Sequence, residues 1–464
     1  MNLNRKSVFL FLLFFIPVSV TLSQPQNFIR GVDVSFLDQI ENHGGVFKEN
    51  GIPRDALSIL HNHGINYVRL RLWHMPSGGY NNLQRTLLMA ARVKQLGMKF
   101  LLDVHYSDSW ADPGQQSKPA AWTGLSFPSL KDSIYRYTRA VMTAMKANNT
   151  LPDMVQIGNE IICGMLWSDG RVCDPYNTPA QWTQLAGLLN EASRGVRESL
   201  TAGDTVKIMM HIDRGGDSAG TRWFFDNLQT YNVPYDVIGL SYYAWWHGGL
   251  NQLAANLQMV SLRYNKDIVL VETAYPWTLG WNDTVHNIVG VPAQLLPGYP
   301  ATVEGQRTFL TDLMTLVRAT PNNKGAGIFY WSPEYISVPS LGSPWENVTL
   351  FDFGGEVLNS IHAFDPPTSV RFAEETAVSF NLGQNYPNPF NPTTNIQFRI
   401  ANFGFVSLKV FDLLGREVAT LLNEEMKPGN YERALDAEVL PSGVYFYRLQ
   451  ARGFVETRKM LLIR

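Results

Sequence analysis

Residues 153–161 have the sequence DMVQIGNEI. An apolar run suited to a buried strand ends here on two polar side chains, Asn159 and Glu160. Polar groups at the end of a core strand are expected where that strand presents them to a site, as the strands of a (β/α)8 barrel do at their carboxyl ends. If this interpretation is correct, the rest of the chain must supply seven similar strands.

Seven other apolar runs of this kind are present. Amphipathic stretches with helical spacing separate them, such as residues 83–97 and 130–147. Several of these stretches end in glycine, as at Gly64 and Gly97, which fits a left-handed cap before the next strand. The eight predicted strands are residues 29–36, 66–73, 98–106, 153–160, 206–212, 235–243, 267–274 and 325–332.

Eight strands with a helix after each of the first seven predict an α/β chain folded as a (β/α)8 TIM barrel. A doubly wound open sheet is the alternative. That fold often has a Gly-rich phosphate-binding turn after its first strand, which residues 31–40 lack. The loops after the third, fourth and seventh predicted strands are long, whereas the turns from helix to strand are short. This asymmetry predicts a site on the strand-to-helix side.

The composition indicates one large domain and a smaller one. The chain has 464 residues, of which 45% are hydrophobic and 17% charged. Residues 386–400 are rich in turns and proline, and short alternating strands follow, which is typical of a small β-sandwich. We therefore expect a barrel domain over residues 24–365 and a β-sandwich over 366–464. The net charge of -2 indicates no nucleic-acid partner.

The N-terminus has the pattern of an export signal. Arg5 and Lys6 precede an apolar run, residues 8–18, and Ser23 offers a cleavage point. We therefore predict that residues 1–23 are a signal peptide. A membrane anchor is the alternative, but the run is short for a membrane span.

The chain has two cysteines, Cys163 and Cys173, close together after Glu160. In an exported protein this spacing is compatible with a local disulfide. Two free thiols are the alternative, because sequence does not give the distance between them.

A second glutamate, Glu272, lies near the end of the seventh predicted strand. The fourth and seventh strands of a barrel lie across from each other, so Glu160 and Glu272 can face one point. Glycoside hydrolysis needs two carboxyls flanking one bond, one protonated and the other ionised. A single buried glutamate is more often an ion-paired structural group. Two glutamates at opposite strand ends, with aromatic residues around them, favour the catalytic interpretation.

Other residues near the strand ends are predicted to bind a sugar chain. Asn159 can hydrogen-bond the sugar 2-hydroxyl. Arg69 and Arg71 alternate on the second strand, so a guanidinium near Glu272 would keep it ionised, while one of the two arginines is expected to form a structural ion pair. His105 has a structural alternative as a satisfied polar group, and single tryptophans are more often core. The predicted substrate-binding set is Arg71, His105, Asp108, Trp110, Asn159, Tyr243, Trp246 and Trp331.

Four segments resemble the endo-β-1,4-galactanases of glycoside hydrolase family 53. The specific signal is LLDVHYSDSWADPGQQSKPAAW, residues 101–122, since a strand that ends in Asn-Glu is shared with xylanases, mannanases and cellulases. The similarity extends from about Arg30 to Phe353, although Ala244 stands where we expect proline. The other three segments are VQIGNE (155–160), SYYAWWHG (241–248) and VLVETAYP (269–276).

The resemblance implies that Glu160 is the acid/base and Glu272 the nucleophile, with retention of anomeric configuration. It implies cleavage within chains of β-1,4-galactan, such as the arabinogalactan side chains of pectin, with no cofactor for catalysis. We expect a monomer. The alternatives are the same chemistry on mannan or xylan, a catalytically inactive glycan-binding surface protein, and a structural surface protein.

The resemblance also suggests a structural calcium ion, because some bacterial members of that family carry one in the loop after the seventh strand. Here this loop, residues 277–290, contains Asp283, His286 and Asn287 as the predicted ligands, with Asp352 as a further candidate. Oxygen ligands suit calcium, whereas histidine is an unusual ligand for it. A loop held by hydrogen bonds alone is the alternative.

Roughly the last hundred residues resemble the C-terminal sorting domain of the type IX secretion route. The cues are YPNPFNPTTNIQF (386–398), VFDLLGREV (410–418), PSGVYFYRL (441–449) and a basic end, TRKMLLIR (457–464). The resemblance implies export through outer-membrane secretion machinery, with release or attachment at the cell surface. A carbohydrate-binding module is the alternative, but the segment has no cluster of tryptophans.

Overall fold

The computed structural model describes residues 28–365, 380–400, 404–426, 429–451 and 454–463. The predicted signal peptide and the predicted domain boundary near Pro366 lie outside these residues. The chain divides into two compact units, Met1–Pro367 and Thr368–Arg464, which are described separately. None of the helices in the described residues is long and apolar enough to cross a membrane.

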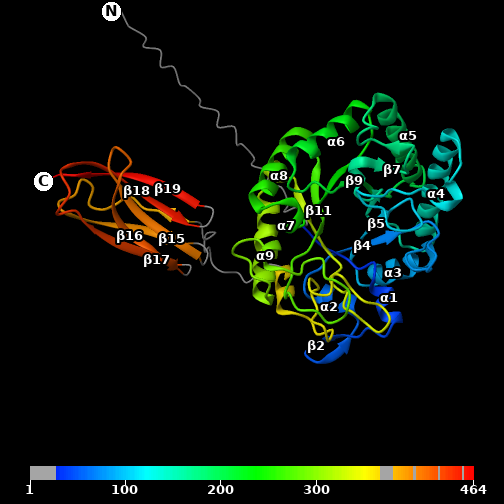
Figure 1. Cartoon of the computed structure of the whole chain (residues 1–464), viewed down its shortest axis with the longest axis horizontal. Coiled ribbons are helices and arrows are strands. Elements are labelled where there is room, and N and C mark those ends of the chain that lie inside the picture. The colour runs from blue at the N-terminus through cyan, green and yellow to red at the C-terminus, as the bar shows by residue number, and fades with distance from the viewer. Residues whose placement is uncertain (1–27, 366–379, 401–403, 427–428, 452–453, 464) are drawn as a thin grey trace, which may run out of the picture. The chain divides into compact units, whose positions relative to one another are not determined.

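Eight parallel strands close into a barrel in the first unit (Figure 1). Around the barrel they follow the order β1-β12-β11-β10-β9-β6-β5-β4. All eight predicted strands are therefore confirmed. Their bounds are β1 Ile29–Asp33, β4 Tyr67–Leu72, β5 Lys99–Val104, β6 Met154–Ile157, β9 Lys207–Ile212, β10 Val237–Ser241, β11 Asp267–Thr273 and β12 Gly325–Trp331.

Helices follow the strands, as predicted, and several of them begin at capping side chains. Ser126 caps the helix after β5 and Thr178 caps the helix after β6, and each helix has proline in its first turn. Gly64 and Gly97 adopt the predicted left-handed conformation. The helices are α1 Leu37–Asn42, α2 Ala56–Asn62, α3 Leu83–Gln95, α4 Phe127–Ala147, α5 Pro179–Arg197, α6 Ser218–Thr230, α7 Ala244–His247, α8 Leu250–Tyr264 and α9 Val303–Arg318.

The barrel interior has an apolar layer and then a polar one. The buried apolar layer includes Tyr67, Leu101, Met154 and Met209. Two residues further along the same four strands come buried polar side chains: Arg69, Asp103, Gln156 and His211. Side chains two residues apart on a strand point to the same face. The barrel interior therefore has a layer of polar side chains, called here the polar floor, between the apolar layer and the carboxyl ends of the strands.

The second unit consists of two antiparallel sheets. Their strand orders are β13-β14-β17 and β16-β15-β18-β19. Buried apolar residues of both sheets, such as Phe398 and Leu408, form one core, as expected of the predicted β-sandwich. The strands are β13 Asn381–Leu382, β14 Thr393–Ile400, β15 Gly404–Phe411, β16 Glu417–Met426, β17 Gly429–Asp436, β18 Gly443–Ala451 and β19 Phe454–Leu462.

Candidate active site

The first catalytic candidate, Glu160, follows β6 through a tight turn. Gly158 has φ 75°, and Glu160 itself has φ 47°, a left-handed conformation that is uncommon for a residue with a side chain. A Cβ atom on Gly158 would lie 2.6 Å from the Ile161 side chain, so glycine is needed there. The Glu160 carboxyl accepts a hydrogen bond of 2.6 Å from the Ser241 hydroxyl at the end of β10.

The second candidate, Glu272, lies in β11 and is 5% exposed. Its Oε1 accepts a hydrogen bond of 2.8 Å from Arg69 Nη1, and its Oε2 accepts one of 3.0 Å from the Tyr243 hydroxyl. Both contacts stabilise the ionised carboxylate.

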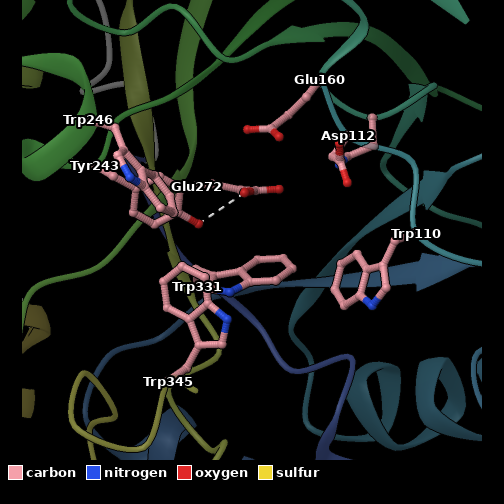
Figure 2. Close-up of a pocket in the computed structure, with 9 residues that line it drawn as sticks. Trp110, Asp112, Glu160, Tyr243, Trp246, Glu272, Trp331 and Trp345 are labelled. Carbon is pink, nitrogen blue, oxygen red and sulfur yellow. Dashed lines mark hydrogen bonds between the residues drawn. The ribbon is translucent and has the colours of Figure 1, made fainter. Parts of the chain in front are cut away.

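The two glutamates line one cavity of about 280 Å³. Figure 2 shows their carboxyl groups pointing into the same space, from β11 on one side and the turn after β6 on the other. The remaining lining is mainly aromatic, which suits the apolar C–H faces of sugar rings. It comprises Trp110, Asp112, Asn159, Tyr243, Trp246, Trp331 and Trp345.

The surroundings of the two carboxyls differ in charge. Burial raises the pKa of Glu160 well above its ordinary value, and the negative charges of Glu272 and Asp213 raise it further. Burial, together with the negative charges of Asp33 and Asp103, also raises the pKa of Glu272, to about 7, although the Arg69 guanidinium and the Tyr243 hydroxyl oppose this rise. Since Glu160 forms no ion pair with a described residue, a proton shared by the pair belongs on Glu160, and Glu272 is the ionised member.

Arg69 organises the polar floor beneath Glu272. It is completely buried and donates five hydrogen bonds, including bonds of 2.9 Å to Asp33 and 2.8 Å to Asp103. The other three bonds reach Glu272, Asn159 Oδ1 and Gln156 Oε1. One rigid cation therefore orients both the predicted nucleophile and the residue that precedes the predicted acid.

A neutral histidine supports Glu160 from below. His211 is fully buried, and burial lowers its pKa well below the ordinary value. Its Nδ1 accepts a hydrogen bond from the Glu160 backbone N–H, so its Nε2 carries the proton and donates to Ser241 Oγ at 2.8 Å. The Ser241 hydroxyl is then directed toward Glu160.

Comparison with known proteins agrees with this geometry. Residues 29–364 match the model of glycosyl hydrolase family 53. The chain belongs to this family. The family 53 resemblance predicted from the sequence motifs is therefore confirmed.

Individual relatives of this family 53 chain cover nearly the same segment. An uncharacterised protein encoded in the bgaB 5' region of Niallia circulans is 48% identical, covering 72% of this chain and 93% of that protein. The arabinogalactan endo-β-1,4-galactanase of Cellvibrio japonicus is 34% identical, covering 70% and 86%. The solved family 53 catalytic domain of Ignisphaera aggregans superposes with a TM-score of 0.69 at 40% identity, covering 74% and 97%. Separately, residues 384–463 match a secretion system C-terminal sorting domain.

Five of the residues predicted to bind substrate line the family 53 cavity: Trp110, Asn159, Tyr243, Trp246 and Trp331. Trp246 is 56% exposed at the cavity edge, whereas Trp331 is 6% exposed. One N–H of Asn159 Nδ2 donates to the Ala111 carbonyl at 2.9 Å, and the second N–H has no protein acceptor among the described residues.

Three predicted substrate-binding residues do not line the cavity. Arg71 is 1% exposed, with its guanidinium 4.0 Å from the centre of the Trp110 ring. His105 is buried and donates from Nε2 to Asp103 at 3.0 Å. Asp108 accepts from the backbone N–H groups of Met75 and Ala120, and so ties two loops together. All three residues instead pack against, or hydrogen-bond to, residues that surround the cavity.

Two lining residues were absent from the predicted set. Asp112 lies in the long 101–122 segment that carried the family resemblance, so its position was a usable signal. Trp345 lies well beyond the end of β12 and gave no strand-end signal. The sequence left open which of Arg69 and Arg71 lies near Glu272, and the predicted substrate-binding set included Arg71 alone. Arg69 is the arginine that contacts Glu272.

The residues predicted to bind calcium each contact different partners in the structure. Asp283 accepts from the backbone N–H groups of Val285 and Ser343. His286 is exposed and packs edge-on against Trp281. Asp352 closes its own turn by accepting from Gly354 and Glu356. Of the predicted ligands, Asn287 is the one with a buried oxygen, Oδ1, that lacks a hydrogen-bond partner among the described residues.

The loop after β6 is closed by a covalent bond. Cys163 and Cys173 form a disulfide with a Cα–Cα distance of 4.8 Å, which decides between the two alternatives left open by the sequence. The bond encloses the short hairpin of β7 (Gly164–Met165) and β8 (Gly170–Arg171). The segment that follows Glu160 is therefore restrained.

Proposed function

We propose that this protein is an endo-acting, retaining glycoside hydrolase that cleaves β-1,4-galactosidic bonds in galactan and in the arabinogalactan side chains of pectin. The observation that carries the proposal is the pair of Glu160 and Glu272 in one aromatic-lined cavity, where the pKa of Glu160 is raised well above its ordinary value and Glu272 has Arg69 as a cationic partner. The galactanase name of the Cellvibrio japonicus relative supports the substrate.

In the first step the Glu272 carboxylate attacks the anomeric carbon, while Glu160 gives its proton to the glycosidic oxygen. The bond between the anomeric carbon and that oxygen breaks, and the leaving sugar departs as an alcohol. In the second step Glu160 removes a proton from water, and the hydroxide formed displaces Glu272 from the sugar. Two inversions give net retention. No cofactor takes part in this scheme.

The test uses Glu160→Ala and Glu272→Ala with linear β-1,4-galactan as substrate. In each variant the rate of reducing-sugar release should fall by at least about a thousandfold, because both carboxyls act in the same reaction steps. The circular dichroism spectrum should stay native. An active Glu272→Ala enzyme would refute the assignment. Wild-type activity on mannan or xylan in place of galactan would favour the substrate alternative, and binding without cleavage would favour an inactive glycan-binding protein.

The sorting-domain match indicates secretion and display at the cell surface by the type IX route. We propose that residues 1–23 act as the signal peptide for the first membrane and that the mature enzyme is a monomer. The secretion machinery is then the partner of the second unit, and galactan is the partner of the first.

We also propose a structural calcium ion at the loop after β11, because buried oxygens there lack donors. Besides Asn287, the buried Glu346 and Asn347 each have an oxygen without a partner among the described residues. Both residues contact this loop, Glu346 through the Asn282 N–H and Asn347 through the carbonyls of Thr278 and Val289. This oxygen-rich set suits calcium better than His286 does. A chelator should lower the melting temperature, and Glu346→Gln should remove that sensitivity.

A further inference from the structure

A cluster of histidines and carboxylates lies in the first unit, outside the cavity of the two glutamates. Its members are Glu49, His63, His362 and Asp365. One ligand atom from each of His63, His362 and Asp365 lies within 4.8 Å of the other two. We propose that these three residues bind a zinc ion and that Glu49 orients His63. This site does not depend on the glycosidase function proposed above.

The cluster joins three segments that are far apart in the chain. His63 follows α2, in the turn that leads to β4. Glu49 ends the short strand β2 (Phe47–Glu49). His362 lies in the 3-10 helix η5 (Asn359–Phe364), and Asp365 is the C-cap of that helix. Since residues three apart in a 3-10 helix lie one above the other, His362 and Asp365 face the same side.

Both ring nitrogens of His63 face a carboxylate. Nε2 lies 2.9 Å from Glu49 Oε1, and Nδ1 lies 3.3 Å from Asp365 Oδ1. A neutral imidazole carries one N–H, so it can donate to only one of these two carboxylates. Its other nitrogen then presents a lone pair to a carboxylate oxygen. A further cation must satisfy this second contact, either a second proton on the ring or a metal ion.

The second histidine favours the metal ion. His362 Nδ1 lies 2.8 Å from Asp365 Oδ2, and the centres of the two imidazole rings are 5.0 Å apart. Two protonated rings at this distance would repel each other. A single divalent ion binds both rings in their neutral form and satisfies Asp365 at the same time.

The donor set is typical of zinc. Zinc takes histidine nitrogen and aspartate oxygen, whereas calcium and magnesium take oxygen ligands. Tetrahedral zinc places its ligand atoms about 3.4 Å apart, so the side chains must close by about 1.4 Å at most. The His362 and Asp365 side chains are 44% and 42% exposed. They therefore have room for this adjustment, and water can enter as the fourth ligand.

Glu49 provides the contact that metal-bound histidines commonly make. Their second ring nitrogen donates to a carboxylate, which fixes the tautomer and the orientation of the ring. Arg54 Nε lies 3.5 Å from Glu49 Oε2, which leaves Oε1 for His63 Nε2. With Nε2 protonated, Nδ1 of His63 is the nitrogen that faces Asp365 and the zinc ion. The ion would then tie η5, at the C-terminal end of the first unit, to α2.

The test is zinc binding to the full-length protein at neutral pH, measured by titration calorimetry and by melting temperature. The probe is zinc chloride, and calcium is present throughout so that the site proposed after β11 stays filled. Wild type should bind one zinc ion at this site. Its melting temperature should rise by about 3–5 °C when zinc is at about a hundred times its dissociation constant.

Three variants and a control locate the ion. His362→Ala and Asp365→Asn should each lower the zinc affinity at least about tenfold, and Glu49→Gln should lower it about 10- to 100-fold. All three should keep the native circular dichroism spectrum. His61→Ala is the control, because His61 is an exposed histidine of α2 outside the cluster and its loss should leave the affinity unchanged.

The zinc site is refuted if wild type shows neither a heat of binding nor a rise in melting temperature, since protons would then satisfy the two histidines. It is also refuted if His362→Ala and Asp365→Asn bind zinc as tightly as wild type, because the ion would then lie elsewhere. An equal loss of affinity in His61→Ala would likewise exclude this set of ligands.

Discussion

Replacing Tyr243 by phenylalanine removes one hydroxyl from the site and little else. This hydroxyl donates to Glu272 at 3.0 Å and stabilises its ionised form. A hydrogen bond to a charged group contributes about 1.5–3 kcal/mol, and each 1.36 kcal/mol is tenfold in rate. We therefore expect kcat/KM on galactan to fall by about 10- to 150-fold.

The same substitution should move the pH profile in a defined direction. The Tyr243 hydrogen bond lowers the pKa of Glu272, so its loss raises that pKa. Because Glu272 must be ionised to attack, the acidic limb of kcat/KM should move to higher pH. The assay is reducing-sugar release from linear galactan across the pH range.

Tyr242→Phe is the matched control for this experiment. Tyr242 is the neighbouring tyrosine, is equally buried, and donates its hydroxyl to the Gly248 carbonyl at 2.8 Å. Its loss should lower the free energy of unfolding by about 1 kcal/mol without moving the pH profile. If Tyr243→Phe keeps wild-type activity and the wild-type acidic limb, Glu272 does not depend on this contact and the proposed assignment of charges is wrong.

Two further predictions concern Glu160 and the second unit. The Ser241 hydroxyl donates to Glu160 and lowers its pKa. Ser241→Ala should therefore raise the pKa of Glu160 and move the basic limb of the pH profile to higher pH. The measurement is the rate of galactan hydrolysis over a series of pH values. A chain ending at Pro367 keeps the whole first unit and should retain reducing-sugar release within about twofold. A folded but inactive truncation would mean that the second unit takes part in catalysis.

The proposed catalytic pair was predictable because its position depends on local sequence pattern and on one rule of topology. Each apolar run is visible in the sequence by itself, and parallel strands in a barrel all end at the same face. Glu160 and Glu272 were identified by their place at two such ends. The alternation of strand side chains also placed Arg69 and Arg71 on one face before any coordinates were known.

Short-range periodicity in the sequence was enough to predict the two folds, the order of the strands and the two carboxyls proposed for catalysis. The coordinates were needed to show which arginine pairs with Glu272. Arg69 lies in the layer of Asp33 and Asp103, whereas Arg71, two residues later, lies among the rings of Phe36, Trp73 and Trp110. These contacts join segments that are far apart in the chain. The local sequence pattern shows which face of the strand each arginine lies on, but not how deep in the barrel it lies.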